Sequence, residues 1–396
     1  MDDGARDVPG PAPDQLRGLV DPVRVAVVGV AGMGRAHYFA ASSMPEYELA
    51  AICDVVEKVR EKTAARLEVP GFADAAELYA SGLVDAVILA TPPSTHGPLV
   101  CDALAAGLHV YCEKPFVADA AEGYALGEQA RAAGLVVQVG FQYRFQPSYA
   151  HVRALIDEGA VGPIFRSSLV ATNWFRPQGY FEAAGWRKEW RHAGGGVLMN
   201  QAIHQLDALL WFTGLPARVT ARASRARHDI EVEDDAMALL EFPNGGRGTI
   251  VASLVDPVGS DRIEVHGERC SLMMDEHELR IGTFDGPAQK LSDESTNHYD
   301  RVPVTWEDVS VPPVSPGGYD YMMDAHRDFV GAIAEHRSPR ISPEEGTRAI
   351  EVANAVYVSA VLDEPVELPL ASGAYAAVYE QLCAGEVALP KLRRVG

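Results

Sequence analysis

Three features are scarce or missing in this 396-residue sequence, and each limits what the protein can be. Its five cysteines form no Cys-x-x-Cys pair, which favours buried thiols in a reducing compartment over a disulfide framework. No apolar run approaches the roughly 20 residues that span a bilayer. Positive charge is also in deficit, because the formal net charge is −21 and such a chain repels a phosphate backbone. We therefore expect a cytoplasmic protein that binds neither membranes nor nucleic acid.

The composition itself is that of a globular protein, with 47% hydrophobic and 22% charged residues. The length suffices for two domains that each bury a core. Residues 1–22 are polar and rich in proline and glycine, without an apolar segment or cationic leader, so we expect a flexible N-terminal extension and not a signal peptide. We expect a first domain over 23–145, a second over 146–370 and a C-terminal tail over 371–396.

Short apolar runs alternate with helical patterns throughout the first domain, which is typical of a doubly wound parallel sheet of the Rossmann kind. Helices are predicted over Pro98–Ala106 and over Ala120–Ala133, where Gly134 supplies a C-cap. The predicted strands are Val23–Gly29, Tyr47–Cys53, Asp85–Ala90, His109–Cys112 and Leu135–Val139.

After about Gln146 strands follow one another with few helices between them, which predicts an α+β domain with a large open mixed or antiparallel sheet. Pro243-Asn244-Gly245-Gly246 is a strong hairpin-turn signal. Two late helices should pack on this sheet or return to the first domain. The predicted strands are Ile164–Phe175, Arg218–Arg225, Ala236–Phe242 and Arg247–Leu254, and the predicted helices are Pro147–Glu158, Tyr319–Glu335 and Pro343–Val361.

A glycine-rich turn joins the first predicted strand to the first helix. It consists of Gly29, Val30, Ala31, Gly32, Met33 and Gly34. In this position backbone N–H groups and the helix N-terminus face a pyrophosphate, so the turn is a candidate dinucleotide site. Ala31 stands where the strict G-x-G-x-x-G pattern has its second glycine. A turn that simply packs tightly is the alternative.

An acidic residue ends the second predicted strand, 20 residues after Gly34. Asp54 is therefore in register to accept hydrogen bonds from the hydroxyls of an adenosine ribose. A carboxylate there repels a 2′-phosphate, and Val55 offers no cation to bind one. This pair of features favours NAD over NADP as the cofactor.

Three further segments occur in an order that carries a family resemblance. Thr91-Pro92-Pro93-Ser94-Thr95-His96 follows one strand, Glu113-Lys114-Pro115 follows the next, and a Gly194-Gly195-Gly196 turn precedes Leu198, His204 and Asp207. With the glycine turn, these segments make the sequence resemble the Gfo/Idh/MocA oxidoreductase family over roughly residues 24–370. The resemblance implies a Rossmann domain followed by an open-sheet domain, a homodimer or homotetramer, and cofactor contacts from Thr91, Pro92, His96, Glu113 and Lys114.

Lys114 is predicted to lie at the carboxyl end of a parallel strand, the edge where open α/β sheets bind ligands. An ammonium there donates to a substrate oxygen and stabilises developing alkoxide character. Pro115 constrains the backbone beside it, in a cis or a trans bond. A solvated surface lysine is the alternative interpretation.

The segment after the glycine turn places Asn200, His204 and Asp207 at i, i+4 and i+7, which predicts one polar helix face toward a cleft. His204, with an ordinary pKa near 6.5, suits proton abstraction from a carbinol, although a structural histidine is the alternative. Asn200 stands where many members of the family have aspartate. An amide can position a hydroxyl but cannot stabilise an imidazolium by charge. Gln201 is a further substrate-contact candidate.

A loop rich in aromatic and basic residues precedes this helix. Aromatic faces suit the C–H surface of a sugar ring, and arginines bind hydroxyls or acidic groups. The family resemblance implies that Trp186 and Arg187 approach the nicotinamide, while packing of the loop is the alternative for its tryptophans. Trp174, Tyr143 and Arg144 are further substrate-contact candidates. The sequence shows no recognisable metal-ligand spacing.

These observations favour an NAD-dependent dehydrogenase that oxidises a hydroxyl of a sugar, glycoside or cyclitol. His204 takes the hydroxyl proton in this interpretation, and Lys114 polarises the oxygen. An NAD-dependent glycosidase that oxidises transiently is one alternative, distinguished by turnover without net NADH. A non-catalytic NAD-binding regulator is the other, and it has no need of Lys114 and His204.

Overall fold

The N-terminal part of the chain forms a six-stranded parallel sheet with strand order β3-β2-β1-β4-β5-β6. The computed structural model describes residues 21–275, 278–310 and 319–392, so the expected N-terminal extension lies almost wholly outside the described residues. The five predicted strands are confirmed, with slightly shifted ends. The additional β3 has only two residues and too short a pattern to detect. The strands are β1 (Val23–Val28), β2 (Tyr47–Cys53), β3 (Gly71–Phe72), β4 (Ala86–Leu89), β5 (His109–Cys112) and β6 (Val137–Val139).

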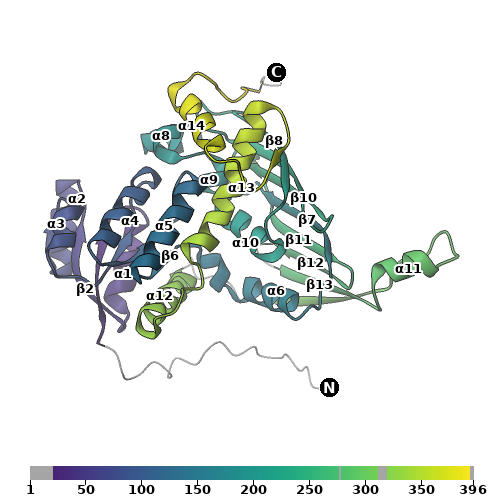
Figure 1. The fold of residues 1–396 in the computed structure, drawn as a ribbon, viewed down its shortest axis with the longest axis horizontal. Coiled ribbons are helices and arrows are strands. Elements are labelled where there is room, and N and C mark those ends of the chain that lie inside the picture. Colours follow the sequence, from purple (N-terminus) through teal and green to yellow (C-terminus); the bar gives the residue numbers. More distant parts are fainter. Residues whose placement is uncertain (1–20, 276–277, 311–318, 393–396) are drawn as a thin grey trace.

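Helices alternate with these strands, as the pattern predicts, and they give the first domain its doubly wound architecture (Figure 1). The chain runs outward in one direction from β1 to β3 and in the other from β4 to β6. A crevice is therefore expected at the carboxyl ends of β1 and β4, where strand order reverses. The helices are α1 (Gly34–Ser43), α2 (Glu57–Leu67), α3 (Ala75–Ala80), α4 (His96–Ala105) and α5 (Ala120–Ala133).

The second domain is built on a nine-stranded sheet with order β14-β13-β12-β11-β7-β10-β9-β8-β15. Its β7–β10 pair is parallel and its other neighbours are antiparallel, so the predicted mixed sheet is confirmed. The predicted hairpin turn joins β9 to β10, but the strand predicted to reach Phe175 ends at Ala171. The strands are β7 (Ile164–Ala171), β8 (Arg218–Ser224), β9 (Asp235–Glu241), β10 (Arg247–Ser253), β11 (Asp261–Gly267), β12 (Cys270–Asp275), β13 (Glu278–Phe284), β14 (Val304–Ser310) and β15 (Val366–Glu367).

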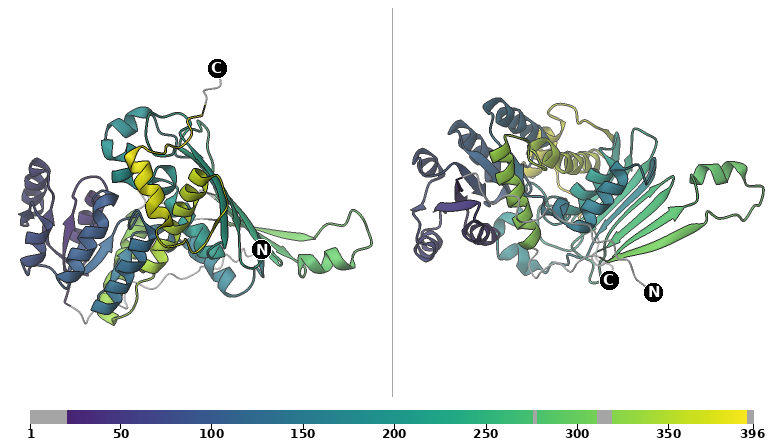
Figure 2. Two further views of the ribbon diagram at one scale, coloured as in Figure 1. Left: turned by 45° about the horizontal axis from the view of Figure 1, so that its top comes forward. Right: turned by 90° about the horizontal axis from the view of Figure 1, so that it is seen from below.

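One face of this sheet is covered by helices and the other is open (Figures 1 and 2). The helices that contact this face are α10 (Ile203–Thr213) and α13 (Pro343–Leu362), and α6 (Pro147–Asp157) packs against α10. On the open face Met237 is 54% exposed and Leu239 is 59% exposed, while their neighbours Ala236, Ala238 and Leu240 are buried. The hairpin of β13 and β14, with α11 (Ala288–Glu294) at its tip, projects away from the body (Figure 2).

Two C-terminal helices alter the expected domain boundaries. Helix α12 (Tyr319–Glu335) returns to the first domain, where Met322 and Phe329 pack into the same core as Val25 and Ile88 of the parallel sheet. The Rossmann core is therefore completed by residues far outside 23–145. The segment expected to be a tail contains α14 (Ala374–Ala384), whose Tyr375, Val378 and Leu382 are buried against the second domain.

A buried ion pair joins the two domains. Arg144, in the turn η2 (Gln142–Phe145) after β6, donates from Nε and Nη2 to the Asp207 carboxylate at 2.8 and 2.7 Å. Its Nη1 donates to Glu345 of α13 at 2.9 Å. Arg144 and Asp207 are each only 1% exposed. The pair holds α10 against the end of the parallel sheet.

Removing one partner of this pair should destabilise the protein strongly, because a buried charge loses its counter-ion. We expect Arg144→Met to lower the free energy of unfolding by about 3–5 kcal/mol. The double variant Arg144→Met with Asp207→Leu should recover much of that loss. Urea unfolding followed by circular dichroism measures both. Glu128→Gln, which breaks an exposed pair with Arg131, is the control and should change stability by less than about 0.5 kcal/mol. An equally small effect of Arg144→Met would contradict the role assigned to the pair.

Candidate active site

The carboxyl ends of the parallel strands bring together segments that are far apart in the sequence. Gly29 N donates to Cys53 O at 2.8 Å, Ala90 N to Val28 O at 2.9 Å, and Glu113 N to Leu89 O at 2.9 Å. These bonds place the glycine turn, Asp54, Thr91 and the Glu113-Lys114 step along one edge. The glycine turn, Asp54 and Lys114 were expected at this edge because each follows a predicted strand, whereas Thr91 and Glu113 were expected from the family resemblance.

The glycine turn fits a pyrophosphate. Gly29 has φ +83°, and a Cβ on it would lie 2.8 Å from Ala90 O. A Cβ on Gly34 would overlap the carbonyl oxygen of Gly29, so this turn needs glycine at both positions. Helix α1 begins at Gly34 with Met33 as its N-cap, and Ala31, Gly32 and Met33 are exposed in front of it. Exposed N–H groups at a helix N-terminus are a suitable site for a phosphate anion.

Asp54 follows β2 directly and is 9% exposed. Its carboxylate accepts from Val30 N at 3.0 Å and from Val56 N at 2.8 Å, so it ties the end of β2 to the glycine turn. A carboxylate has about four lone-pair directions, and two acceptor positions are left for ribose hydroxyls. The donor set of turn and carboxylate thus fits a dinucleotide such as NAD.

A buried histidine joins two of the predicted cofactor segments. The His96 ring lies between Pro115 O, 2.8 Å from Nδ1, and Thr91 O, 2.9 Å from Nε2. Burial lowers the pKa of His96, although the two carbonyl contacts oppose this shift. The Lys114–Pro115 peptide bond is cis. His96 therefore shapes the loop through these carbonyls, while Pro92 is exposed on its outer side.

Lys114 reaches from the first domain to the second. Its ammonium donates to the main-chain carbonyl oxygen of Asn200 at 2.8 Å, and Lys114 and His204 are close enough for the charge of one to shift the pKa of the other. Burial lowers the pKa of Lys114, and the negative charge of Glu113 opposes that effect. Two residues predicted to act on one substrate oxygen are thus brought together by the domain packing.

The His204 ring is held by aromatic packing. It stacks on Tyr143 with ring centroids 4.7 Å apart and meets the edge of Phe141 at 5.7 Å. Its Nδ1 is buried without a hydrogen-bond partner in the described part of the chain. Burial, reinforced by the Lys114 charge, holds the pKa of His204 well below its usual value. A neutral imidazole with an unsatisfied nitrogen is suited to accept a proton.

The predicted single helix carrying Asn200, His204 and Asp207 is wrong in its geometry. The helix is interrupted at Gln201 and Ala202, between α9 (Val197–Asn200) and α10. Asp207 is buried against Arg144 and does not face a cleft. The same ion pair contradicts the expectation that Arg144 contacts substrate. The Asn200 side chain donates from Nδ2 to Gly195 O at 2.8 Å and so closes the glycine turn.

Sequence reasoning missed Glu233, whose side chain holds the start of α9. The Glu233 side chain is fully buried and accepts from Gly196 N at 2.8 Å, Leu198 N at 3.0 Å and the Tyr357 hydroxyl at 2.8 Å. Burial raises the pKa of Glu233 to about 7, against the effect of these three donors. The carboxylate caps the start of α9 and so positions Asn200. An acidic residue just before an alternating strand was the available signal.

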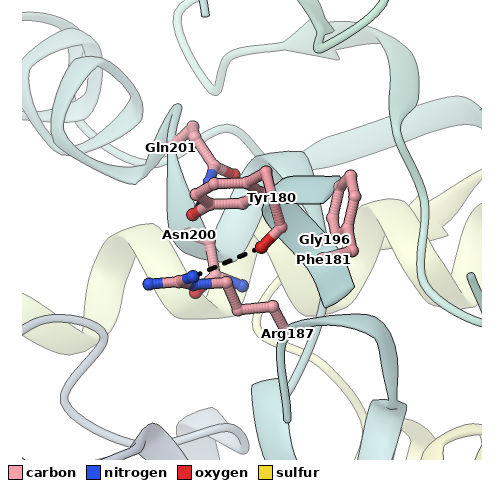
Figure 3. Close-up of a pocket in the computed structure, with 6 residues that line it drawn as sticks. All are labelled: Tyr180, Phe181, Arg187, Gly196, Asn200 and Gln201. Carbon is pink, nitrogen blue, oxygen red and sulfur yellow. Dashed lines mark hydrogen bonds between the residues drawn. The ribbon is translucent and has the colours of Figure 1, made fainter. Parts of the chain in front are cut away.

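The aromatic and basic loop lies beside α9. Arg187 packs over the Tyr180 ring at 4.4 Å and over Trp186 at 5.3 Å, and Gln201 Nε2 donates to the Tyr180 hydroxyl at 2.8 Å. Trp174 stacks with Arg176 at 5.1 Å, and its Nε1 is buried without a partner among the described residues. Figure 3 shows the small pocket here, lined by Tyr180, Phe181, Arg187, Gly196, Asn200 and Gln201.

Two family models match this chain. Residues 23–141 match the oxidoreductase family with an NAD-binding Rossmann fold, and residues 149–273 match the GFO/IDH/MocA C-terminal domain. The first match covers the glycine turn, Asp54 and Lys114, and the second covers His204. The first match lies in the parallel-sheet domain and the second in the domain of the nine-stranded sheet. The protein is an oxidoreductase with an NAD-binding Rossmann domain.

Relatives and solved structures agree with these matches. The chain is 31% identical to scyllo-inositol 2-dehydrogenase (NAD(+)) of Bacillus subtilis over 264 residues, which is 64% of this chain and 73% of that protein. It is 26% identical to levoglucosan dehydrogenase of Pseudarthrobacter phenanthrenivorans over 88% of this chain and 98% of the relative. The WlbA dehydrogenase of Bordetella pertussis, solved with NADH and UDP-GlcNAcA, superposes with a TM-score of 0.74 at 25% identity, covering 88% of this chain and all of that one. The chain belongs to the GFO/IDH/MocA oxidoreductase family.

Proposed function

We propose that this protein is an NAD-dependent dehydrogenase that oxidises a hydroxyl of a sugar, glycoside or cyclitol to a ketone. The observation that carries the proposal is the convergence of Lys114 and His204 from two domains. One is a cation held 2.8 Å from the Asn200 carbonyl, and the other is a buried neutral base. The relatives named as dehydrogenases of inositol and levoglucosan support the same substrate class.

The division of labour follows from the charges. His204 accepts the hydroxyl proton, because burial and the Lys114 charge keep its ring neutral and its Nδ1 has no hydrogen-bond partner among the described residues. Lys114 donates to the substrate oxygen and offsets the negative charge that develops there. The bound nicotinamide supplies the acceptor for the hydride that leaves the carbinol carbon. Tyr143 keeps the His204 ring in place by stacking.

The surrounding loops supply the candidates for substrate and cofactor contacts. Asn200 and Gln201 line the pocket and offer amide groups for hydroxyls. Trp174, which shares Arg176 with the pocket residue Tyr180, is a further candidate for substrate contact. Arg187 also lines the pocket and packs over the Trp186 ring, so these two residues are candidates for contact with the nicotinamide end of the cofactor. Gly29, Ala31, Gly32, Met33 and Gly34 would hold the pyrophosphate, and Asp54 the ribose.

We also propose that the open face of the nine-stranded sheet binds a second copy of the chain. Met237 and Leu239 on β9 stand in register with Val251 and Thr249 of β10, which makes a partly apolar outer surface. Exposed apolar patches on a sheet mark association sites, and isologous contacts close dimers.

Among the residues that the structure describes, we find no helix with the length and apolar character that a membrane span requires.

The activity itself is tested by screening sugars, glycosides and inositols for NAD reduction. With a substrate found, His204→Ala should lower turnover on the order of 10²- to 10⁴-fold, the usual effect of losing a positioned base, with little change in NAD affinity. Lys114→Ala should lower turnover and also weaken substrate binding, because the ammonium contacts the oxygen in the ground state as well. Stopped-flow absorbance at the NADH band and calorimetric NAD titration measure these effects. Near-normal turnover of His204→Ala would assign the proton to another group.

The pH dependence of oxidation should report the environment of His204. Because burial and then the Lys114 charge lower its pKa, kcat/KM should rise with pH, reach half its maximum below the ordinary histidine value of about 6.5, and level off above it. Removing the cation in Lys114→Met should move the His204 midpoint upward, which ring NMR of the protein without substrate detects. A midpoint at or above the ordinary value, unmoved by Lys114→Met, would contradict this assignment.

Cofactor preference should depend on Asp54. The wild type should bind NADH more tightly than NADPH, since the carboxylate accepts from ribose hydroxyls and repels a 2′-phosphate. Asp54→Asn should reduce that preference by about tenfold or more, by removing the charge while keeping the shape. Calorimetric titration with both nucleotides measures this. Asp74→Asn, at the start of α3, is the control and should leave the preference unchanged. Tighter NADPH binding by the wild type would overturn the assignment.

Assembly should depend on the open sheet face. Wild-type protein should sediment as a dimer or tetramer at micromolar concentration. Leu239→Glu, which places a charge in the apolar surface, should shift it toward smaller species. Thr283→Glu, an exposed position on the distal strand β13, serves as the matched control. A wild-type monomer, or a Leu239→Glu protein that sediments like the wild type, would count against this interface.

A further inference from the structure

A chain of buried polar side chains runs from the Lys114 loop to helix α12. Glu113 Oε1 lies 2.8 Å from His37 Nε2, His37 Nδ1 lies 3.0 Å from His326 Nε2, and His326 Nδ1 lies 3.1 Å from the Tyr47 hydroxyl. Both histidines are fully buried, and Glu113 and Tyr47 are 5% and 6% exposed. Glu113 directly follows β5, and His37, His326 and Tyr47 lie in α1, α12 and β2. None of these contacts takes part in the mechanism described above.

One arrangement of protons satisfies every atom in this chain. The Tyr47 hydroxyl donates to His326 Nδ1, His326 Nε2–H donates to His37 Nδ1, and His37 Nε2–H donates to the Glu113 carboxylate. Each ring then carries one proton and remains neutral. Burial is the main reason that the pKa of His326 lies well below its usual value, which agrees with a neutral ring there. All donors therefore point toward Glu113, and an ionised Glu113 carboxylate accepts the last of these hydrogen bonds.

Glu113 is also attached to the lysine. Its Oε2 accepts from the Lys114 main-chain N–H at 3.2 Å. Burial raises the pKa of Glu113, but the His37 hydrogen bond, with the nearby charges and the Lys114 N–H, outweighs that effect and lowers it overall. The ionisable groups that face Lys114 are its chain neighbour Glu113 and His204 from α10, and Glu113 is the one that favours a cation. Tyr111, Cys112 and His96 also sense the Glu113 charge.

We propose that His37 and His326 are positioning residues for Lys114: through Glu113 they fix the main chain of the lysine and keep a negative charge beside its ammonium. The catalytic strand end is thereby connected to α12, a helix contributed some 200 residues later. The role assigned to Lys114 rests on the proposed function, but its charge state can be measured without any substrate.

Geometry favours this role over simple filling of the core. Aliphatic side chains would fill the space between α1, α12 and the sheet without burying four titratable groups. A buried carboxylate without donors is costly. Tyr111 stacks on His326 with ring centroids 4.6 Å apart and fixes the plane in which its nitrogens point. The arrangement is therefore directional, and its donors end at the residue next to the lysine.

The test is a titration of Lys114 in the protein without substrate or nucleotide. The chain has six lysines, so labelling at the ε carbon gives a simple NMR spectrum in which Lys114→Arg identifies the Lys114 signal. Glu113→Gln, which keeps the shape and removes the charge, should lower the titration midpoint of Lys114 by about one pH unit or more. His37→Leu should lower it in the same direction, because the carboxylate then takes up a proton or turns away from the lysine.

Conservative variants separate positioning from packing. His37→Gln retains an N–H where the ring has Nε2 and should restore much of the wild-type Lys114 midpoint. His326→Phe should lower this midpoint as His37→Leu does, but by a smaller amount. His109→Leu, at the opposite end of the same strand β5, perturbs the sheet without touching Glu113 and should leave the midpoint unchanged. Thermal melts confirm that each variant is folded.

A Lys114 midpoint that stays at the wild-type value in both Glu113→Gln and folded His37→Leu would overturn the proposal. A shift of the Lys114 midpoint in Glu113→Gln with none in any folded His37 variant would also overturn the proposal, because Glu113 would then act on Lys114 without the hydrogen bonds from His37 and His326. An absence of dehydrogenase activity would instead contradict the proposed function and leave these titrations readable.

Discussion

Charge removed from water at the junction of two domains is the constraint on which this structure depends. Lys114 is partly buried and finds one partner in the Asn200 carbonyl of the other domain. Arg144 is buried in the same junction and forms ion pairs with Asp207 and Glu345, both of which belong to the second domain. Because a buried ion without a partner costs several kcal/mol, these contacts fix how the domains meet. The position of His204 beside Lys114 follows from that arrangement.

The backbone around the site is shaped by equally specific buried groups. Glu233 accepts from the amides of Gly196 and Leu198, and Asp54 accepts from the amides of Val30 and Val56. The His96 ring lies between the carbonyl oxygens of Thr91 and Pro115. Each is a polar side chain that satisfies main-chain groups a loop cannot satisfy alone. The loops that would contact cofactor and substrate are thus held in place by buried side chains that hydrogen-bond their main chain.

Much of the site could be predicted because chemistry follows strand order. The glycine turn, Asp54 and Lys114 each stand directly after a strand, and parallel strands end at one edge, so their assembly needs no knowledge of side-chain contacts. His204 was predicted from its place after a glycine turn and from the family resemblance. Glu233, His37 and His326 were not, since a buried polar residue in a sequence looks the same as a surface one. Arg144 was misassigned for the same reason.

The sequence by itself determined the alternation that produces a doubly wound sheet, the glycines that alone permit the turn at Gly29 and Gly34, and the residue types available for proton transfer. Those features are local, because each depends on side-chain periodicity or on the backbone freedom of one residue. Only the tertiary structure decided that α12 completes the Rossmann core, that the helix breaks between Asn200 and Ile203, and that Asp207 serves Arg144 instead of a cleft. These outcomes depend on which groups are buried together across the two domains, and the partner of a buried charge is chosen by packing between distant segments and not by spacing along the chain.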